Sequence, residues 1–146
     1  MPSVLNCLAE AFAPYQSSYT AEAFLDTVLS AETIKLRMKS MRIFVAEDRS
    51  GGAIIGTVAC NLVSPEEGHL RGMAVLPSYF GSGVAQQLLK TAEAELRAQR
   101  CIRITLDTTE PLRRAINFYR RNGFQPSGRI SNFFGMPLYE YVKVLK

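Results

Sequence analysis

The sequence predicts one α/β domain in which helices flank a mixed central sheet of about six strands. Its 146 residues are a typical length for a single domain, so we treat residues 1–146 as one unit. Segments of β-rich composition alternate with segments of helical periodicity, without internal repeats or a linker. The helical segment 83–99 connects two strand-like segments, and a crossover of this kind joins parallel strands. The sheet should therefore contain a parallel pair.

The first forty residues predict helices and no strand. Residues 3–15 (SVLNCLAEAFAPY) have an amphipathic pattern that Pro14 ends. Thr20, followed by the acidic Glu22, is typical of a helix start, and the helical pattern continues from Ser30. The predicted sheet thus begins only after these helices.

The next thirty-odd residues predict strands. Segments 42–48 and 53–63 are β-rich, and RSGG at 49–52 indicates a hairpin between them. Residues 68–76 predict a further strand, which Pro77 ends. Strand alternation predicts one shared face for His69, Arg71, Met73 and Val75.

The second half of the chain continues the alternation. The helix predicted at 83–99 has an apolar face formed by Leu88, Leu89, Ala92 and Leu96. A strand is predicted at 101–108, followed by a helix at 111–124 with Pro111 in its first turn and Gly123 at its end. Two further strands complete the predicted sheet.

The composition is that of an ordinary soluble globular protein, with 47% hydrophobic and 21% charged residues. No apolar run approaches the roughly 20 residues of a membrane span, and no signal-peptide pattern opens the chain. Cys7, Cys60 and Cys101 are widely spaced and lack a CxxC motif or a histidine cluster. We therefore expect reduced cysteines in a cytoplasmic protein, with neither a disulfide nor a metal site.

The formal net charge is +4, and arginines are concentrated in the second half of the chain. Such a bias can attract nucleic acid, a membrane surface or a phosphorylated small molecule. The arginines are scattered over several elements and lack interleaved aromatic residues, which argues against a single-strand binder. We expect mostly a solvated surface, with a few arginines near an anionic ligand and no nucleic acid or membrane partner.

Two glycines stand at the start of the helix 83–99, in VLPSYFGSGVAQQLL (75–89). A helix N-terminus offers free N–H groups and a partial positive charge, and glycine lets an anion approach them. For an isolated GxG, a tight turn that requires positive φ is the favoured explanation. The motif is no P-loop, because no lysine follows Gly83, and it lacks the third glycine of a dinucleotide fingerprint.

A second motif follows the next predicted strand, in RRAINFYRRNGF (113–124). Together with the glycine loop and the strand between them, it resembles the GNAT superfamily of N-acetyltransferases. In that superfamily a Gln/Arg-x-x-Gly-x-Gly/Ala loop holds the pyrophosphate of acetyl-CoA, and residues 78–83 match it in part. The later Ala-x-x-Phe/Leu-Tyr-x-x-x-Gly-Phe pattern is matched by Ala115, Phe118, Tyr119, Gly123 and Phe124. Both motifs, in this order, make the resemblance fairly specific.

The resemblance implies a GNAT-like fold whose usual first edge strand is absent here, and it assigns a binding surface for acetyl-CoA. The cofactor phosphates would lie on the amides of Gly81, Ser82, Gly83, Val84 and Ala85. The strand before the loop splays from its neighbour in this superfamily, which leaves Met73, Ala74 and Val75 to pair with the pantetheine and the acetyl oxygen. Tyr119 would protonate the leaving thiolate. An aromatic ring that packs on the sheet is the alternative role for Tyr119.

The base that deprotonates the amine is left open. His69 is the only histidine, and its ordinary pKa near 6.5 suits this work. Glu66 and Glu67 lie just before it and are alternatives. Deprotonation in bulk solvent, with His69 as an ordinary strand residue, is equally compatible with the sequence.

Three residues depart from the GNAT pattern. Ser78 stands for Gln or Arg, Phe80 for a common Arg, and Leu112 for a cofactor-contacting Asn. Arg120 and Arg121 are candidates for the missing positive charge. The superfamily places acceptor specificity in segments that here are roughly 13–39 and 127–137, which contain Tyr15, Tyr19, Phe133 and Phe134.

The resulting expectation is an acetyl-CoA-dependent N-acetyltransferase that acts on a primary amine of a small molecule or protein by direct transfer. The alternatives are a non-catalytic acyl-CoA-binding or sensing domain and, less favoured, a basic nucleic-acid-binding module. Acetyl-CoA and the amine are the expected partners, and a homodimer is left open.

Overall fold

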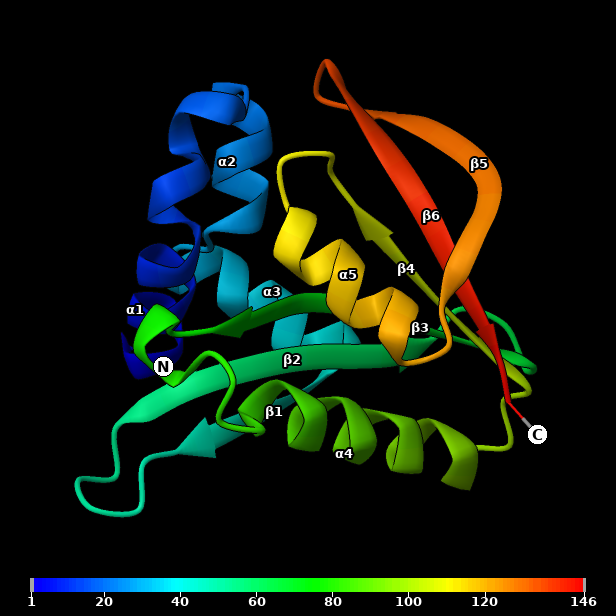
Figure 1. Cartoon of the computed structure of the whole chain (residues 1–146), viewed down its shortest axis with the longest axis horizontal. Coiled ribbons are helices and arrows are strands. Elements are labelled where there is room, and N and C mark those ends of the chain that lie inside the picture. Colours follow the sequence, from blue (N-terminus) through cyan, green and yellow to red (C-terminus); the bar gives the residue numbers. More distant parts are fainter. Residues whose placement is uncertain (1, 146) are drawn as a thin grey trace.

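The computed structural model describes residues 2–145 and has a mixed six-stranded sheet at its centre (Figure 1). The strand order is β1-β2-β3-β4-β6-β5. The strands are β1 (Arg42–Glu47), β2 (Ile54–Leu62), β3 (Glu67–Val75), β4 (Arg103–Thr108), β5 (Gln125–Phe133) and β6 (Met136–Val144). Only β3 and β4 are parallel, as the crossover between them predicts. The first strand, β1, is an edge strand that follows three helices, so the fold prediction is confirmed.

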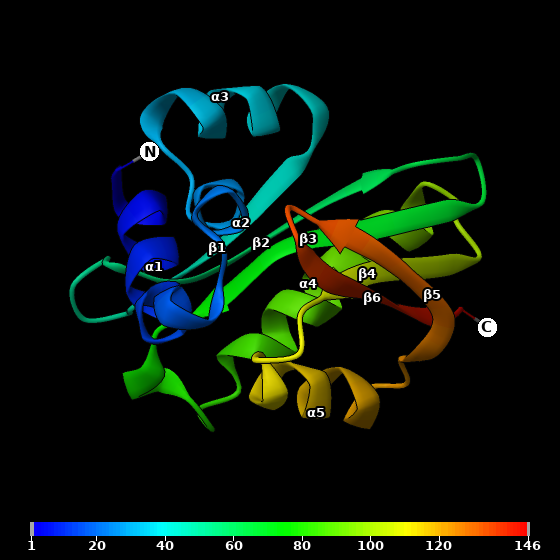
Figure 2. The same ribbon diagram turned by 90° about the horizontal axis from the view of Figure 1, so that it is seen from above.

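Helices cover both faces of the sheet (Figure 2). One face carries α1 (Pro2–Phe12), α2 (Ala21–Thr27) and α3 (Ala31–Ser40), and the other carries α4 (Val84–Ala98) and α5 (Arg113–Arg121). Pro14 ends α1 as predicted, because the chain tightens there into the 3₁₀ segment η1 (Ala13–Ser18). A second 3₁₀ segment, η2 (Pro77–Tyr79), follows β3. The α3 helix has its own capping box between Ser30 and Thr33, and it is therefore separate from α2.

Two apolar cores follow from this layering. The larger core packs α4 and α5 on the sheet, with Leu89, Leu96, Ile104 and Phe124 almost fully buried. The smaller core packs α1 and α3 on the other face around Val4, Leu8 and Ile34. Cys7, Cys60 and Cys101 are buried in these cores and are free.

The sheet splits between its two parallel strands. Pairing of β3 with β4 runs from Glu67 and Arg103 to Leu70 and Leu106 and then stops. Each strand continues beyond that point, β3 to Val75 and β4 to Thr108. Both strands keep their outer partners there, β2 and β6, so only the edges that face each other lose their partner. The split exposes a stretch of unpaired backbone on each strand.

A bulge in β3 coincides with this split. Ala59 pairs with Arg71 and Thr57 with Ala74, so Gly72 and Met73 together lie opposite Val58. Gly72 has φ +63°, which glycine adopts without strain. The extra residue reverses the alternation: Leu70 and Val75 both join the larger core, whereas Ala74 joins the smaller one. The predicted common face of His69, Arg71, Met73 and Val75 is therefore wrong beyond Arg71.

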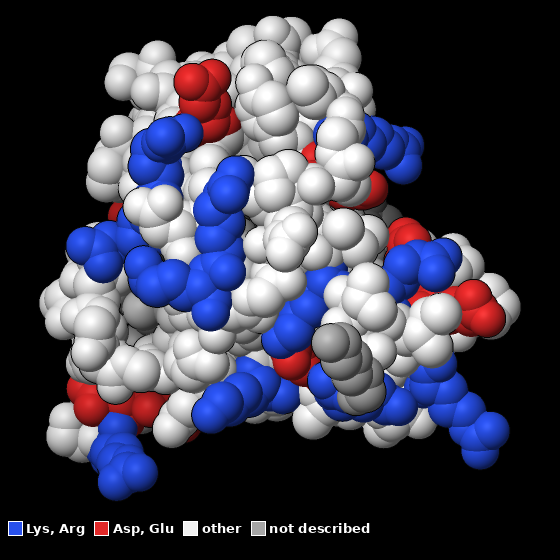
Figure 3. Space-filling view, turned by 45° about the vertical axis from the view of Figure 1, so that its right-hand side comes forward, with Lys and Arg blue, Asp and Glu red and all other residues white. Residues whose placement is uncertain are grey.

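Charged side chains are spread over the surface. Figure 3 draws one face of the molecule, on which Lys and Arg predominate over Asp and Glu. No helix within residues 2–145 is long and apolar enough to cross a membrane. No group of His, Cys, Asp and Glu side chains in the same part of the chain could hold a metal ion.

Candidate active site

A cavity of about 840 Å³ passes through the split between β3 and β4. Its walls include the free edges of both strands and residues from the helices on both faces of the sheet. We call the part lined by Gln86, Phe118 and Tyr119 the α4–α5 end, and the part lined by Tyr15, Tyr19, Asp26, Arg37 and Arg71 the α1–α3 end. A ligand in the cavity could therefore be reached by groups from both layers.

The glycine loop forms the rim of the α4–α5 end. Gly83 caps α4 at φ +91°, and Gly81 has φ +77°, so the turn itself requires both glycines. A Cβ at either position would meet no atom within 4 Å, which leaves open space beside the backbone. The N–H groups of the first turn of α4 have no carbonyl partner within the helix. Positive φ and open space beside a helix N-terminus thus occur together at this loop.

The five predicted phosphate-binding residues divide into two groups. Gly81, Gly83 and Ala85 line the cavity, whereas Ser82 and Val84 do not. The Ser82 amide and hydroxyl both donate to the carbonyl of Tyr79, at 3.2 and 2.5 Å. Ser82 therefore stabilises the turn, and its N–H is not free for a ligand.

An arginine that the sequence reasoning missed lies over this loop. The Arg114 guanidinium is 4.3 Å from the centroid of the Phe80 ring, and both residues line the cavity. Stacking on the ring leaves the edge N–H donors of the guanidinium available. Arg121 also lines the cavity, whereas Arg120 lies over the Tyr141 ring, 5.7 Å from its centroid. Phe80, which replaces a loop arginine, thus supports an arginine from α5.

Tyr119 lies where the apolar core meets the cavity. It is 7% exposed, has edge contacts with the rings of Phe118 and Phe124, and lines the cavity. Burial raises the pKa of its phenol well above the usual value. Its hydroxyl has no hydrogen-bond partner among the described residues. The ring therefore packs on the sheet, which is the alternative role considered for Tyr119, and its phenol stays protonated.

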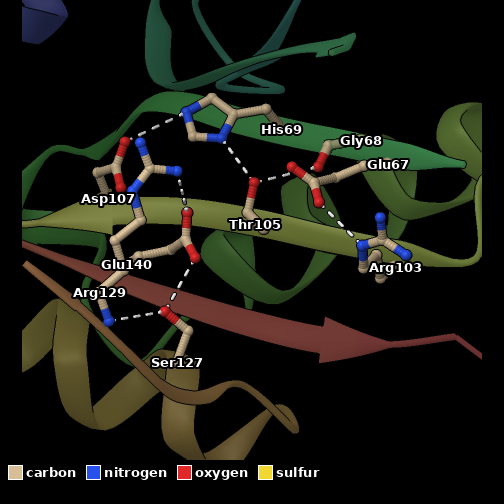
Figure 4. Close-up of polar contacts among 9 residues, drawn as sticks. All are labelled: Glu67, Gly68, His69, Arg103, Thr105, Asp107, Ser127, Arg129 and Glu140. Atoms are coloured by element: carbon tan, nitrogen blue, oxygen red, sulfur yellow. Dashed lines mark hydrogen bonds and ion pairs between the residues drawn. The ribbon is translucent and has the colours of Figure 1, made fainter. Parts of the chain in front are cut away.

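His69 is the centre of a polar cluster on the opposite face of the sheet (Figure 4). Its Nδ1 is 2.9 Å from Thr105 Oγ1, and its Nε2 is 3.7 Å from Asp107 Oδ2. Burial lowers the pKa of His69, against the raising effect of Asp107, and burial likewise raises the pKa of Asp107. His69 and Asp107 both line the cavity. At neutral pH the imidazole is therefore uncharged and faces a carboxyl group.

Glu67 lies apart from this cluster. Its carboxylate accepts a hydrogen bond of 2.8 Å from Arg103 Nε (Figure 4). Neither Glu66 nor Glu67 is among the cavity-lining residues. The carbonyl of Glu66 instead accepts hydrogen bonds from the backbone of Ile102 and Arg103. Of the candidate bases, only His69 reaches the cavity.

The free strand edges complete the wall. Met73, Ala74 and Val75 line the cavity from the β3 side, and Thr108 lines it from the β4 side. The Thr108 hydroxyl is buried and has no hydrogen-bond partner among the described residues. An orphaned buried hydroxyl is costly unless a ligand or water satisfies it. The cavity wall therefore has polar groups that a bound molecule could pair.

The model of the GNAT acetyltransferase family matches residues 3–124. The chain belongs to the GNAT family. A search of curated protein sequences gives no match. The same fold occurs in several solved GNAT structures.

Three of these structures illustrate the likeness. A GNAT-family acetyltransferase from Staphylococcus aureus has 19% sequence identity, a TM-score of 0.78, and coverage of 99% of this chain and 92% of its own. The PaiA N-acetyltransferase of Thermoplasma acidophilum, solved with coenzyme A, has 16% identity, a TM-score of 0.77, and coverage of 98% and 91%. A GNAT-family acetyltransferase from Elizabethkingia anophelis, solved with acetyl-CoA, has 20% identity, a TM-score of 0.68, and coverage of 80% and 84%. At these identities the likeness shows a shared fold.

Three cavity residues of this GNAT chain were missed from the sequence. Asp107 could have been found, because alternation along 103–107 predicts one face for Arg103, Thr105 and Asp107. Arg114 and Arg37 have no comparable signal, since each reaches the cavity only through the packing of its helix.

Proposed function

We propose that this protein is an acetyl-CoA-dependent N-acetyltransferase that transfers the acetyl group directly to a primary amine of a small molecule or protein. The proposal depends mainly on one observation: a single cavity through the split sheet is lined by His69 on one face and Tyr119 on the other. The two faces would supply the acid and the base of one reaction.

The fit of acetyl-CoA is supported by the loop and the free edge. Its pyrophosphate would lie on the open side of Gly81 and Gly83, at the N-terminus of α4, with Arg114 and Arg121 beside it. Its pantetheine amides would pair with the unpaired backbone of Met73, Ala74 and Val75. When bound, acetyl-CoA supplies an activated acyl group whose carbonyl a backbone N–H of β3 would polarise.

The proton transfers are assigned to His69 and Tyr119. The Thr105 hydroxyl donates to the carbonyl of Gly68 at 3.4 Å, so the N–H at His69 Nδ1 would donate to Thr105. This leaves Nε2 to accept the proton of the amine, directly or through water, with Asp107 stabilising the imidazolium. Tyr119, which lines the cavity from the other face, would give its proton to the leaving thiolate.

The test combines binding with turnover. Acetyl-CoA should raise the melting temperature, and a panel of amines should support release of free CoA thiol. Tyr119→Phe should lower kcat by about 100-fold or more, the usual contribution of a positioned acid, and leave acetyl-CoA binding intact. Tyr139→Phe is the matched control, because Tyr139 is half-buried in β6 and does not line the cavity.

Other outcomes would favour the alternatives. No stabilisation by acetyl-CoA would exclude both the enzyme and the acyl-CoA sensor. Stabilisation without thiol release for any amine would favour the sensor. Binding to nucleic acid that weakens steeply with salt and ignores CoA would favour the basic module. Thiol release unchanged by Tyr119→Phe would remove Tyr119 as the acid.

A further inference from the structure

The α1–α3 face of the cavity contains the two arginines Arg37 and Arg71 and the two carboxyl groups of Asp26 and Asp107. Arg71 of β3 and Asp26 of α2 form an ion pair, with 2.5 Å between Nη2 and Oδ2. Arg37 of α3 lines the same face, and none of the described acidic side chains forms an ion pair with it. Asp26 is the ion-pair partner of Arg71, and Asp107 lies beside His69, so the cation of Arg37 is left without an ion pair among the described residues.

The Arg37 guanidinium lies against the bulge in β3. Its Nη1 lies 2.7 Å from the position that a Cβ on residue 72 would occupy, so only glycine lets the guanidinium lie there. Burial, followed by the nearby Arg71, lowers the pKa of Arg37 to about 10, and the group stays charged at neutral pH. A half-buried cation beside a second cation costs free energy, which an anionic partner would offset.

The separation between Arg71 and the proposed base His69 indicates the size of an acceptor that could reach both. His69 and Arg71 precede the bulge on one face of β3, two residues apart, so their Cα atoms are separated by about 7 Å. A single small molecule could therefore have its amine at His69 and an anionic group at the two arginines.

We propose that the acceptor is an amine that also carries an anionic group, a carboxylate or a phosphate, and that Arg37 is the residue that selects it. The inference rests on the proposed acetyltransferase function. Arg37 binds the anion through its planar N–H fork, Arg71 adds charge while paired to Asp26, and His69 receives the amine. The unpaired cation of Arg37 disfavours a second cationic group at this position, as in polyamines.

Paired acceptors test the proposal. Thiol release is measured with α-, β- and γ-amino acids against their amides, with aminoethyl phosphate against ethanolamine, and with spermidine. The anionic member of at least one pair should have a KM at least tenfold lower than its uncharged partner. The amino-acid and phosphate arms distinguish the two anions.

Variants of α3 test the role of Arg37. Arg37→Met should raise the KM of the preferred anionic acceptor about tenfold or more, and leave its kcat, the KM of acetyl-CoA and the KM of the uncharged partner unchanged. Arg37→Lys should recover part of the loss, because charge without the fork remains. Lys39→Met on the same helix is exposed and should have no effect. Melting curves show that each variant is folded.

Results that contradict the role of Arg37 differ from results that contradict the acetyltransferase function. Equal use of uncharged acceptors or spermidine by the wild type, or an equal KM change for both members of a pair in Arg37→Met, would overturn the inference. If acetyl-CoA binds but no amine is acetylated, calorimetric titration of the same amines into the CoA-bound protein decides. The inference is supported if the wild type binds the anionic amines and Arg37→Met does not. It is overturned if the wild type does not bind them or if the variant binds them equally well.

Discussion

The groups around His69 have opposite effects on the pKa of its imidazole. Asp107 favours the imidazolium, whereas burial and the cation of Arg71 disfavour it, and the net result is a pKa below the ordinary 6.5. Because the folded pKa is below the unfolded one, the neutral imidazole contributes stability above pH 6.5 that is lost as pH falls through the folded pKa. A neutral His69 at pH 7 is what a base requires.

The chain has one histidine, so a single NMR imidazole signal reports this pKa. We expect a midpoint below 6.5 in the wild type, a lower one in Asp107→Asn, and a higher one in Arg71→Met, since these changes remove a carboxylate and a cation. The acid limb of kcat/KM should move with the NMR midpoint. Glu22→Gln, at an exposed position in α2, is the control. Midpoints that do not respond to either variant would refute the assigned charge environment.

At the scale of elements, the loop 78–83 is in contact with α5 through Phe80 and Arg114. The loop lacks a side-chain cation of its own, and the Phe80 ring holds Arg114 beside the open backbone of Gly81 and Gly83. A charged hydrogen bond to a phosphate contributes about 1.5–3 kcal/mol. The cofactor affinity of this protein should therefore depend on α5 more than on the side chains of its loop.

Arg114→Met should weaken acetyl-CoA binding by about 10- to 100-fold, measured by calorimetry, because it removes one charged hydrogen bond. Arg113→Met is the matched control, since Arg113 is exposed, adjacent and not part of the cavity wall. Binding of acetyl-pantetheine, which has no phosphate, should be the same in both variants and the wild type. An equal loss of affinity for acetyl-pantetheine would show that Arg114 supports the fold and does not bind phosphate.

At the scale of the whole molecule, two helical layers share one split sheet. Cys7 lies in the core between α1, α3 and the sheet, and Cys60 and Cys101 lie in the core under α4 and α5. All three are buried, and burial raises the pKa of Cys7 and of Cys60 to about 11. Labelling of the cysteines can therefore detect the unfolding of each helical layer separately.

Native protein should react with a thiol reagent far more slowly than denatured protein, which should titrate three thiols. If the layers unfold together, the three cysteines should become reactive at the same urea concentration, as mass spectrometry of labelled peptides can show. Earlier labelling of Cys7 alone would show that the α1–α3 layer opens independently. Slow labelling of the native state also means that the protein adds little background to the thiol-release assay.

Much of the fold was predictable because it depends on local patterns. Period-2 and period-3.6 patterning located the strands and helices, and the helix at 83–99 implied the parallel β3–β4 pair. The glycine loop and the Tyr119 motif were sufficient to predict the family. The bulge at Gly72 was not predictable, since one extra residue leaves no mark in the hydrophobic pattern of so short a strand.

The sequence by itself determined the order of the elements, the loop at Gly81 and Gly83, and the chemistry that His69 and Tyr119 can perform. Only the tertiary structure decided which groups share the cavity: it pairs Glu67 with Arg103, brings Asp107 to His69, and places Arg114 on Phe80. The reason is physical. Local sequence governs backbone conformation over a few residues, whereas the split between β3 and β4 and the packing of helices across it bring together residues from distant parts of the chain.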